Sequence, residues 1–598
     1  MTKISYLDGP RFFNAIAAGA QTLFGEREDL NRINVFPVPD GDTGNNLTAT
    51  VASIIEGTTV HPSLQVTADS IADTALVGAR GNSGLILAQY FYGISQEIGG
   101  RDRIETRSLG DLFSGAVRYA RDAISNPVDG TVLTVIEEWS SAVRGLQEKY
   151  SDLADLLPAS LEAARTSLQS TTSRLKALRD ANVVDAAGKG FVALLEGISD
   201  FIRRGHLRNV AEVMSTPREI MEEHSVRQGE VTNRYCTEAI LSSEGLDLPG
   251  LRKQLESFGD SVIVSGHDRK IHFHLHTNQP AELFHELDPI GSFHQPKIDD
   301  MIRQVEAGRE VKPRIALVTD TTSDLPPEIL DRYNIHMVPV QLSFGDSQYL
   351  DRFSITPDIF YRKLAHTTES PTSSQPPVSA FESLYSFLAE HYDSIISINL
   401  SGGLSGTRDA ALTAADRITS VPVTIIDSRT LTAGLGLIVL EAAEAIEQGR
   451  SHEEVVDLVN DTIPLSRVLV GARTLKFFIR GGRISPVQGL VGGLLNVKPI
   501  ITVGRDGKGD TFGRAFSQRG TLRNIEKELE TIIQSAGIRR YAVVHSSRAG
   551  DAAVWAEKLT AITGMPPTYT IDISPVIGVH AGPGALGICL LEGEPVRV

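Results

Sequence analysis

Two carboxylates stand one residue apart in a loop near the N-terminus. Residues 34–46 read Asn-Val-Phe-Pro-Val-Pro-Asp-Gly-Asp-Thr-Gly-Asn-Asn, which puts Asp40 and Asp42 among prolines, glycines and amide side chains. Hard cations such as Mg²⁺ take oxygen ligands, and proteins usually hold them with one or two carboxylates plus substrate phosphates. Glycines in such a loop let a phosphate approach the backbone. The Asp-Gly-Asp triplet alone is typical of an acidic surface turn, but the whole string favours a site for a metal ion and a nucleotide.

A second glycine-rich loop leads into the apolar run at residues 85–92. Backbone N–H groups at the start of a helix attract phosphate, and a serine hydroxyl there adds a donor. Two later loops contain Thr131 and Asp185. Taken singly, the second loop is more typical of a helix N-cap, and the two later loops could be ordinary turns. The candidate phosphate-binding residues of the second loop are Gly81, Asn82, Ser83 and Gly84.

Helical periodicity dominates up to about residue 205, for example in residues 160–168 and 190–197. Glycine loops between helices predict a site that is assembled at helix ends. From about residue 230 the pattern becomes mixed α/β. From residue 314 short apolar strands, for example at residues 315–320 and 423–427, end in small polar loops and alternate with helices, which is typical of α/β architecture. We therefore expect three parts, at residues 1–205, 206–312 and 313–598, with a charged linker at residues 306–313.

Three histidines alternate along one predicted strand, residues 270–277. His272, His274 and His276 therefore point to one face of a sheet. A His-x-His pair on a strand suits zinc, and Cys236 could supply a thiolate. On spacing alone, an exposed polar strand face beside a buried structural cysteine is an equal alternative.

Hydroxyl-rich loops follow several predicted strands in the C-terminal half. Ser373 lies in the string Pro-Thr-Ser-Ser-Gln-Pro, and Ser401 in Leu-Ser-Gly-Gly-Leu-Ser-Gly-Thr. A later loop, residues 577–587, adds His580 among glycines. Hydroxyls, backbone amides and a histidine that converge on one point can hold a carboxylate. Each loop by itself is more typical of a turn or a helix cap.

The composition excludes several classes of partner and compartment. A formal net charge of −17 argues against nucleic acids and anionic membranes as main partners. The two cysteines are far apart in sequence, which fits a reducing cytoplasm. The N-terminal residues lack the apolar core of a signal peptide, and no apolar run is long enough to span a bilayer. We expect a cytoplasmic protein without a transmembrane segment.

The four loops of the first third, in this order, resemble the nucleotide-binding domain of the dihydroxyacetone-kinase family (the DhaL type). The resemblance implies an all-α helical barrel whose acidic loop holds two Mg²⁺ ions on the phosphates of ATP. Asp40 and Asp42 match the catalytic, metal-binding aspartates, and Asn34 stands where the sugar kinases have a third carboxylate. The residues that we expect to contact the nucleotide are Asn45, Asn46, Gly81, Asn82, Ser83, Gly84, Thr131 and Asp185.

The sequence of residues 34–44 itself resembles that of the bacterial fatty acid kinase subunit rather than that of the sugar kinase. The Cys-Thr-Glu string at residues 236–238, followed by a His-x-His-Thr string, resembles the middle domain of the same subunit. That resemblance implies an α/β middle domain with a zinc ion at Cys236, His274 and His276.

From about residue 314 to the end, the chain resembles the DegV family, bacterial fatty-acid-binding proteins of two α/β lobes. The resemblance rests on the hydroxyl-rich loops together with residues 475–485 and 495–500. It implies that Ser373, Ser401 and His580 bind the carboxylate of a fatty acid.

Together the resemblances imply a fatty acid kinase. A fatty acid held by the C-terminal domain would be phosphorylated by the Mg-ATP held by the N-terminal domain, giving acyl phosphate and ADP. The expected partners are a fatty acid, a second copy of the chain in a homodimer, and an acyltransferase that consumes acyl phosphate. Two alternatives stay open: a non-catalytic fatty-acid carrier or sensor, and a kinase for a small ketone such as dihydroxyacetone.

Overall fold

The computed structural model describes residues 3–36, 41–124, 127–204, 231–267, 269–309, 312–367, 369–474, 476–483 and 498–594. Asp40 lies outside these described residues. The chain divides into two compact units, of which the first is Met1–Gln279 with Ile290–Gly308 and the second Pro280–Pro289 with Arg309–Val598. Within the described ranges, no helix combines the length and the apolar character needed to cross a membrane.

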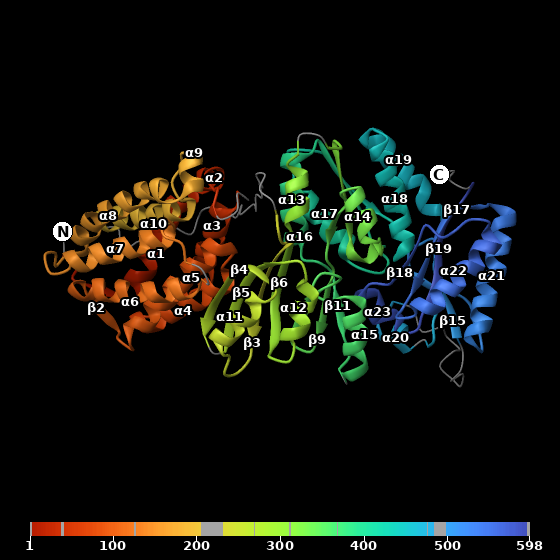
Figure 1. The fold of residues 1–598 in the computed structure, drawn as a ribbon, viewed down its shortest axis with the longest axis horizontal. Coiled ribbons are helices and arrows are strands. Elements are labelled where there is room, and N and C mark those ends of the chain that lie inside the picture. Colours follow the sequence, from red (N-terminus) through yellow and green to blue (C-terminus); the bar gives the residue numbers. More distant parts are fainter. Residues whose placement is uncertain are drawn as a thin grey trace. The chain divides into compact units, whose positions relative to one another are not determined.

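The N-terminal part of the first unit is helical, as the periodicity predicts (Figure 1). A short antiparallel pair of strands, β1 (Tyr6–Asp8) and β2 (Arg103–Glu105), accompanies the helices. Asp8 and Asp152 start two of the helices by accepting backbone hydrogen bonds in the first turn. The helices are α1 (Gly9–Gly25), α2 (Arg27–Arg32), α3 (Thr43–Gly57), α4 (Leu64–Gly78), α5 (Gly81–Ile98), α6 (Leu109–Asp122), α7 (Val132–Leu146), α8 (Leu153–Arg174), α9 (Lys176–Ala181) and α10 (Ala186–Arg204).

These helices close into a ring around a shared apolar core. Each helix from α3 to α8 packs on the next, α8 packs on α10, α10 on α1, and α1 on α3 and α4. The core contains apolar side chains from α1, from α3 to α8 and from α10. Trp139 on α7 contacts Phe113 and Phe191, with ring centroids 5.0 Å and 5.7 Å away. The predicted all-α fold of this part is confirmed.

A four-stranded antiparallel sheet with the order β4-β5-β3-β6 completes the first unit. In the pairing of β3 with β5, Cys236 lies opposite His276 and Glu238 opposite His274. Direct cross-strand partners share a face, so these four side chains point to the same side. The last helix includes residues 306 and 307, so the predicted charged linker begins inside a helix. The elements are β3 (Tyr235–Ser242), α11 (Leu248–Glu256), β4 (Gly259–His267), β5 (Lys270–Thr277), β6 (Ser292–Asp300) and α13 (Met301–Ala307).

The histidine-bearing face of this sheet lies against the helical ring. His272 Nδ1 is 3.0 Å from the carbonyl oxygen of Leu76 on α4. His272, His274 and His276 are all buried. The polar strand face is therefore covered by the helices of the same unit instead of facing solvent.

Sheets with helices on their faces make up the second unit, as predicted for α/β architecture. A four-stranded parallel sheet has the order β13-β12-β7-β8, a six-stranded mixed sheet the order β16-β15-β14-β19-β17-β18, and a small antiparallel sheet the order β10-β9-β11. The strands are β7 (Ile315–Asp320), β8 (His336–Val338), β9 (Gln341–Phe344), β10 (Ser347–Leu350), β11 (Thr372–Ser374), β12 (Ser394–Asn399), β13 (Val423–Asp427), β14 (Ser466–Gly471), β15 (Lys498–Val503), β16 (Gly509–Ala515), β17 (Ile538–His545), β18 (Tyr569–Asp572) and β19 (Leu586–Glu592).

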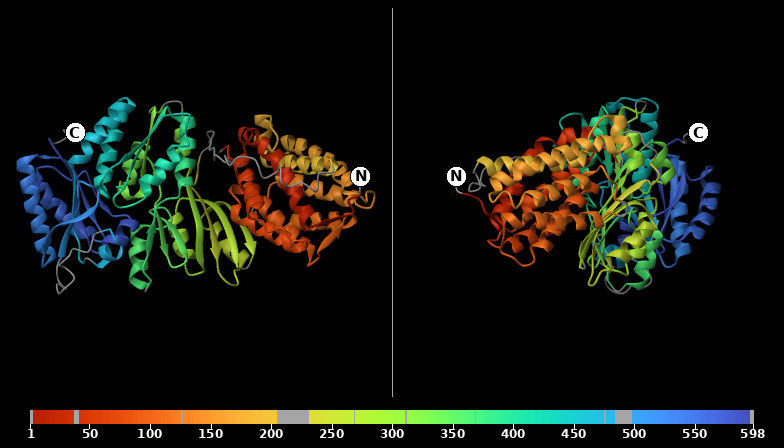
Figure 2. Two further views of the ribbon diagram at one scale, coloured as in Figure 1. Left: turned by 180° about the vertical axis from the view of Figure 1, so that it is seen from behind. Right: turned by 60° about the vertical axis from the view of Figure 1, so that its left-hand side comes forward.

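Helix α18 (Ala433–Glu447) connects the two larger sheets of this unit. It packs on β7 and β12 of the parallel sheet and on β14, β17 and β19 of the mixed sheet. Its residues are buried around almost the whole circumference, as expected for a helix that is apolar on all sides. Figure 2 shows the helices and sheets from two further directions. The other helices are α12 (Pro280–Leu287), α14 (Pro327–Arg332), α15 (Pro357–His366), α16 (Val378–His391), α17 (Thr407–Ala415), α19 (His452–Thr462), α20 (Lys476–Arg480), α21 (Gln518–Ser535), α22 (Ala549–Thr563) and α23 (Pro575–Ala581).

Candidate functional site

A pocket of about 330 Å³ lies in the first unit, between the helical ring and the sheet β4-β5-β3-β6. Its volume is in the range of small-molecule sites. The segments at the starts of α3, α5, α7 and α10 form one wall, and strands β3, β4, β5 and β6 contribute to the other. Its polar lining includes Asn34, Asp42, Asn46, Asn82, Ser83, Thr131 and Asp185 from the helical side, and Cys236, Glu238, His274, His276, Lys297 and Asp299 from the sheet.

The start of α3 presents Asp42 to the pocket. Gly41 has a φ of 71°, in the left-handed region that favours glycine, and turns the chain just before Asp42. The side-chain oxygen of Asn31, on α2, accepts hydrogen bonds from the backbone N–H of Gly44 at 2.7 Å and of Asn45 at 3.2 Å. The first turn of α3 is therefore held in place by its neighbour. Of the predicted residues in this segment, Asn34, Asp42 and Asn46 line the pocket, Asn45 is not among the lining residues, and Asp40 lies outside the described residues.

Gly81 and Gly84, in the first turn of α5, allow this helix to pack closely against α3. Gly81 has a φ of 53°, and a Cβ added there would lie 2.2 Å from Nδ2 of Asn46. A Cβ on Gly84 would lie 2.4 Å from Oγ1 of Thr50 on α3. Both positions therefore need glycine for α5 to approach α3, and Gly84 is not among the lining residues. Asn82 and Ser83 do line the pocket, and Oδ1 of Asn82 is buried without a hydrogen-bond partner in the described part of the chain.

Thr131 and Asp185 lie at the starts of two further helices. Thr131 is the residue before α7, and its hydroxyl donates to the carbonyl of Val128 at 2.8 Å. Asp185 Oδ2 accepts a hydrogen bond from the backbone N–H of Gly188 at 2.7 Å. Burial raises the pKa of Asp185 to about 6, although the backbone N–H groups of Gly188 and Val132 oppose the shift. This carboxyl therefore changes its charge at a mildly acidic pH.

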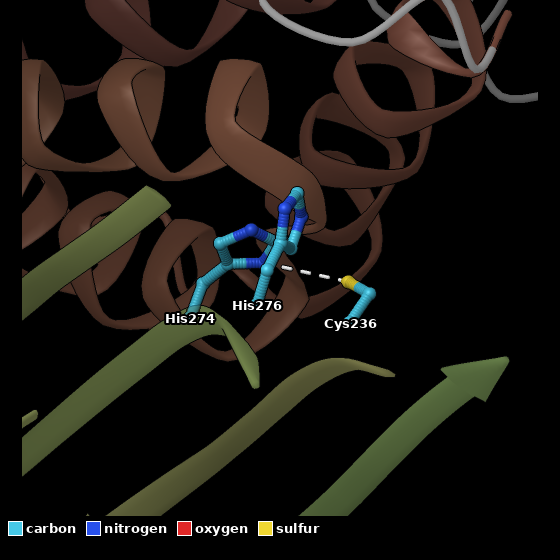
Figure 3. Close-up of side chains that lie close together, drawn as sticks. All are labelled: Cys236, His274 and His276. Atoms are coloured by element: carbon cyan, nitrogen blue, oxygen red, sulfur yellow. Dashed lines mark hydrogen bonds between the residues drawn. The ribbon is translucent and has the colours of Figure 1, made fainter. Parts of the chain in front are cut away.

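Three side chains that could bind a metal project from the sheet toward the helices (Figure 3). One donor atom from each of Cys236, His274 and His276 lies within 4.8 Å of the others. Cys236 Sγ is 3.8 Å from Nδ1 of His274. Thiolate and imidazole donors suit zinc, and three protein ligands with an open fourth position are typical of zinc that is accessible to water or substrate. Because all three residues line the pocket, the group borders the candidate nucleotide site instead of a closed core.

Burial sets the protonation of this cluster. Burial, and then the neighbouring Glu238 carboxylate, raise the pKa of the Cys236 thiol well above its usual value. Burial also lowers the pKa of His272 and that of His276 to about 4. Both imidazoles are therefore neutral near pH 7, and for His276, the one of the two that belongs to the cluster, this is the form that binds a cation. A bound cation would favour the thiolate form of Cys236 that burial disfavours.

Glu238 is a member of this site that the sequence analysis does not single out. Its side chain is buried, and Oε1 lies 2.8 Å from Nδ1 of His274 and 3.0 Å from the backbone nitrogen of Gly81. Strand alternation contains the signal, because Glu238 follows Cys236 by two residues and so faces the same side. Lys297 also lines the pocket, opposite Glu238 on β6, and brings a positive charge to it.

Two of the predicted carboxylate-binding residues meet in the second unit. Ser373 Oγ, on β11, lies 3.0 Å from Nε2 of His580 on α23. Burial, together with the positive charges of Arg483 and Arg480, lowers the pKa of His580 to about 4, so its imidazole is neutral near pH 7. Among the described residues, Nδ1 of His580 is buried and has no hydrogen-bond partner. The two arginines, to which the sequence analysis gives no role, would attract a carboxylate to this point.

Ser401 has a different environment. It is fully buried, and its hydroxyl donates to the carbonyl of Gly507 at 2.7 Å and accepts from the N–H of Gly403 at 3.2 Å. A Cβ on Gly507, which has a φ of 75°, would lie 2.3 Å from Ser401 Oγ. Within the described part of the chain, this hydroxyl joins two loops and forms no hydrogen bond with Ser373 or His580.

The C-terminal half of the chain matches known proteins along their full length. Residues 314–593 match the family model described as "Uncharacterised protein, DegV family". Protein DegV of Bacillus subtilis is 34% identical over 277 residues, which cover 46% of this chain and 98% of that protein. The chain belongs to the DegV family. The crystal structure of DegV from Bacillus subtilis, described as a fatty acid binding protein, has a TM-score of 0.44 and 32% identity, and the match covers 47% of this chain and 100% of that chain.

Two further family models match upstream of the DegV-family region. Residues 37–200 match the DAK2 domain, and residues 232–308 match the middle domain of proteins that are similar to a fatty acid kinase subunit. One chain therefore combines a DhaL-type helical domain, a middle domain of the fatty acid kinase type and a DegV domain. An uncharacterized protein of Staphylococcus epidermidis is 31% identical over 313 residues, which cover 50% of this chain and 56% of that protein. The matched part thus spans little more than half the length of that relative.

Proposed function

We propose that the protein is a fatty acid kinase, which transfers the γ-phosphoryl group of ATP to the carboxylate of a fatty acid bound in its DegV-family region. The observation that carries the proposal is the pocket of the first unit. There, segments at the starts of four helices converge with a cluster of potential metal ligands on the sheet. The DAK2 match and the match to a middle domain of the fatty acid kinase type support the same activity.

In this proposal the helical wall of the pocket binds the nucleotide. Asp42 offers a carboxylate, and Asn34 and Asn46 offer amide oxygens, which are the donor types that Mg²⁺ prefers. When bound, Mg²⁺ would neutralise negative charge on the β- and γ-phosphates. Ser83, at the start of α5, and Asp185 both line the pocket, where Ser83 would supply a hydroxyl to the phosphates and Asp185 would lie near the nucleoside.

The sheet wall contributes the second metal site. Cys236, His274 and His276 would hold a zinc ion, which as a Lewis acid stabilises negative charge on a nearby oxygen. Lys297 contributes a further positive charge to the same pocket. Both charges would oppose the build-up of negative charge as the phosphoryl group leaves ATP.

The proposed acceptor site is the contact between Ser373 and His580. The hydroxyl of Ser373 and the neutral imidazole of His580 carry one hydrogen each. Their mutual hydrogen bond uses one of these, so the pair can donate the other to a carboxylate, and Arg480 and Arg483 favour an anion there. A buried acyl chain would add about 0.8 kcal/mol of binding free energy for each CH₂ removed from water. A longer acyl chain would therefore bind more tightly, provided that it is buried.

The reaction needs no strong base. The carboxylate is ionised near neutral pH, and one of its oxygens attacks the γ-phosphorus. The bond between the γ-phosphorus and the β,γ-bridging oxygen breaks, and ADP leaves with the electron pair. The negative charge of the fatty acid and ATP equals that of acyl phosphate and ADP, so no proton is required. Catalysis then rests on positioning and charge neutralisation. Because both domains belong to one chain, the segment between them raises the concentration of the acceptor at the kinase.

The test is to trap the product. The purified full-length chain is incubated with Mg-ATP, oleate and hydroxylamine, without any other protein, and acyl phosphate is measured as hydroxamate. We expect hydroxamate from the wild type and none from Asp40→Asn or Asp42→Asn. If the wild type binds oleate and ATP but forms no hydroxamate, the proposal is wrong and a carrier or sensor is favoured. If dihydroxyacetone phosphate forms in a parallel reaction with dihydroxyacetone, the acceptor class is wrong.

A further inference from the structure

One carboxylate oxygen joins the candidate zinc cluster to the start of α5. Oε1 of Glu238 is 2.8 Å from Nδ1 of His274 and 3.0 Å from the backbone nitrogen of Gly81. Glu238 is 3% exposed, and its side chain is not part of the ligand group formed by Cys236, His274 and His276. It therefore lies between a proposed metal ligand on β5 and the first residue of α5.

The hydrogen bond to Gly81 constrains residues that line the pocket. Gly81 has a φ of 53°, and a Cβ there would lie 2.2 Å from Nδ2 of Asn46, so the backbone at this point is closely packed. Asn82 and Ser83 follow directly and line the pocket, as does Asn46. A shift of the Gly81 amide would consequently move the groups proposed to contact phosphate.

The contact to His274 depends on which ring nitrogen carries the proton. A neutral imidazole has one N–H, on either Nδ1 or Nε2. Nε2 of His274 is buried and, among the described residues, has no hydrogen-bond partner. If a cation binds Nε2, the proton stays on Nδ1, which then donates a hydrogen bond to the carboxylate. With the proton on Nε2, a lone pair of Nδ1 would face the carboxylate instead, and the contact would be repulsive.

We propose that Glu238 is a positioning residue that couples occupancy of the Cys236–His274–His276 site to nucleotide binding at the start of α5. Metal at the cluster holds Glu238 through Nδ1 of His274, and Glu238 holds the Gly81 amide in the geometry that suits phosphate binding. The coupling rests on the proposed nucleotide and zinc sites, but not on the identity of the phosphoryl acceptor. Because coupling free energies are reciprocal, nucleotide must strengthen metal binding by the same factor by which metal strengthens nucleotide binding.

The experiment measures two affinities on the full-length chain. Mg-ADP binding is measured by calorimetry with zinc bound and after removal of zinc by a chelator selective for zinc over magnesium. Zinc binding is measured by competition with a chromophoric chelator, with and without Mg-ADP. We expect removal of zinc to weaken Mg-ADP binding at least about fivefold, and Mg-ADP to strengthen zinc binding by the same factor.

The variant Glu238→Gln keeps the shape of the side chain but loses its charge. We expect it to bind one metal per chain, with the thiolate absorption of a Co²⁺-substituted cluster retained, while Mg-ADP affinity no longer responds to the metal. Glu244→Gln, an exposed glutamate beyond the end of β3, is the matched control and should keep the coupling. His274→Ala should lose the metal and bind Mg-ADP as weakly as the metal-free wild type.

Two results overturn the inference. One is a wild-type Mg-ADP affinity that is the same with and without zinc. The other is wild-type coupling in Glu238→Gln, which would show that the negative charge of Glu238 does not carry the coupling. The wild-type comparison requires no substitution, so it stays decisive even if Glu238→Gln fails to fold. Since no fatty acid is present, these outcomes are distinguishable from a failure to form acyl phosphate.

Discussion

Asp42 directly precedes α3 and lines the pocket, to which it offers a carboxylate. If it holds Mg²⁺ on the phosphates, replacement by the isosteric amide removes a charge that acts in the transition state. We predict that Asp42→Asn lowers the rate of acyl phosphate formation at saturating ATP by about 100-fold or more. Asp69→Asn, at an exposed position on α4, is the control. A rate for Asp42→Asn within threefold of wild type would contradict the assignment.

Asp185 should make the stability of the first unit depend on pH. Its pKa is raised from 3.8 to about 6, so the folded state holds this proton more tightly than the unfolded state. The resulting stabilisation is complete below pH 3.8 and is lost as the pH rises through 6. The difference between the two pKa values corresponds to roughly 3 kcal/mol in the free energy of unfolding.

We therefore compare the free energy of unfolding of the wild type with that of Asp185→Asn. We predict that the wild-type value minus the variant's value falls by up to about 3 kcal/mol between pH 4 and pH 7. The measurement uses urea unfolding in a Trp555→Phe background. Trp139, in the core of the helical ring, is then the reporter for the first unit, because the chain has only two tryptophans. A difference that stays constant with pH would contradict the raised pKa.

Ser373 and His580 should act as a unit in binding a carboxylate. A hydrogen bond to a charged group contributes about 1.5–3 kcal/mol, so Ser373→Ala and His580→Gln should each weaken oleate binding by about tenfold or more. Either substitution breaks the 3.0 Å contact between Ser373 and His580. The double variant should therefore have about the same affinity for oleate as the single variant with the lower affinity. Ser374→Ala, next to Ser373 and bonded to Gln341, is the matched control. Fully additive losses in a calorimetric titration would argue against a shared site.

The sequence predicts the residue types of the site better than their contacts. Asp42, Ser83 and Asp185 come from separate loops, yet all three line one pocket. Ser401 shows where prediction of contacts fails, because its hydroxyl donates a hydrogen bond to the carbonyl of Gly507, more than 100 residues away in the sequence. Such a contact leaves no local pattern in the sequence. The description of Asp40 as a metal ligand stays a prediction, since that residue lies outside the described ranges.

At the scale of elements, the start of α5 is the most constrained part of the candidate site. Gly81 combines a positive φ with a Cβ position 2.2 Å from Asn46, and its amide bonds to Glu238. We predict that Gly81→Ala weakens Mg-ADP binding at least about tenfold, because the strained backbone and the clash displace Asn46 and the loop. Gly145→Ala, inside α7 with open space around it, should leave binding unchanged and slightly stabilise the helix. Equal affinities of wild type and Gly81→Ala in calorimetry would show that the loop adapts.

The elements themselves follow closely from local patterns. Alternation predicts the strand Lys270–Thr277 with its observed bounds, and apolar runs predict Ile315–Asp320 and Val423–Asp427 equally well. Alternation does not predict which part of the protein, if any, covers a given face of a strand. A polar strand face with three histidines is compatible with solvent, and only the packing against the helical ring, through contacts such as that of His272 with Leu76, shows that it is buried.

At the scale of the whole molecule, one chain combines three types of domain: DhaL-type, fatty-acid-kinase middle and DegV. The candidate phosphate donor site lies in the first compact unit and the candidate acceptor site in the second. The central claim is that these two sites carry out one reaction without another protein.

Phosphorus NMR of ATP turnover by the purified chain with oleate and Mg²⁺ tests this claim most directly, because it separates phosphoryl transfer from hydrolysis. We predict an acyl phosphate resonance that grows at the same rate as that of ADP, requires oleate and is absent with Asp42→Asn. ADP and inorganic phosphate without an acyl phosphate resonance, or no ATP consumption although both ligands bind, would contradict the account.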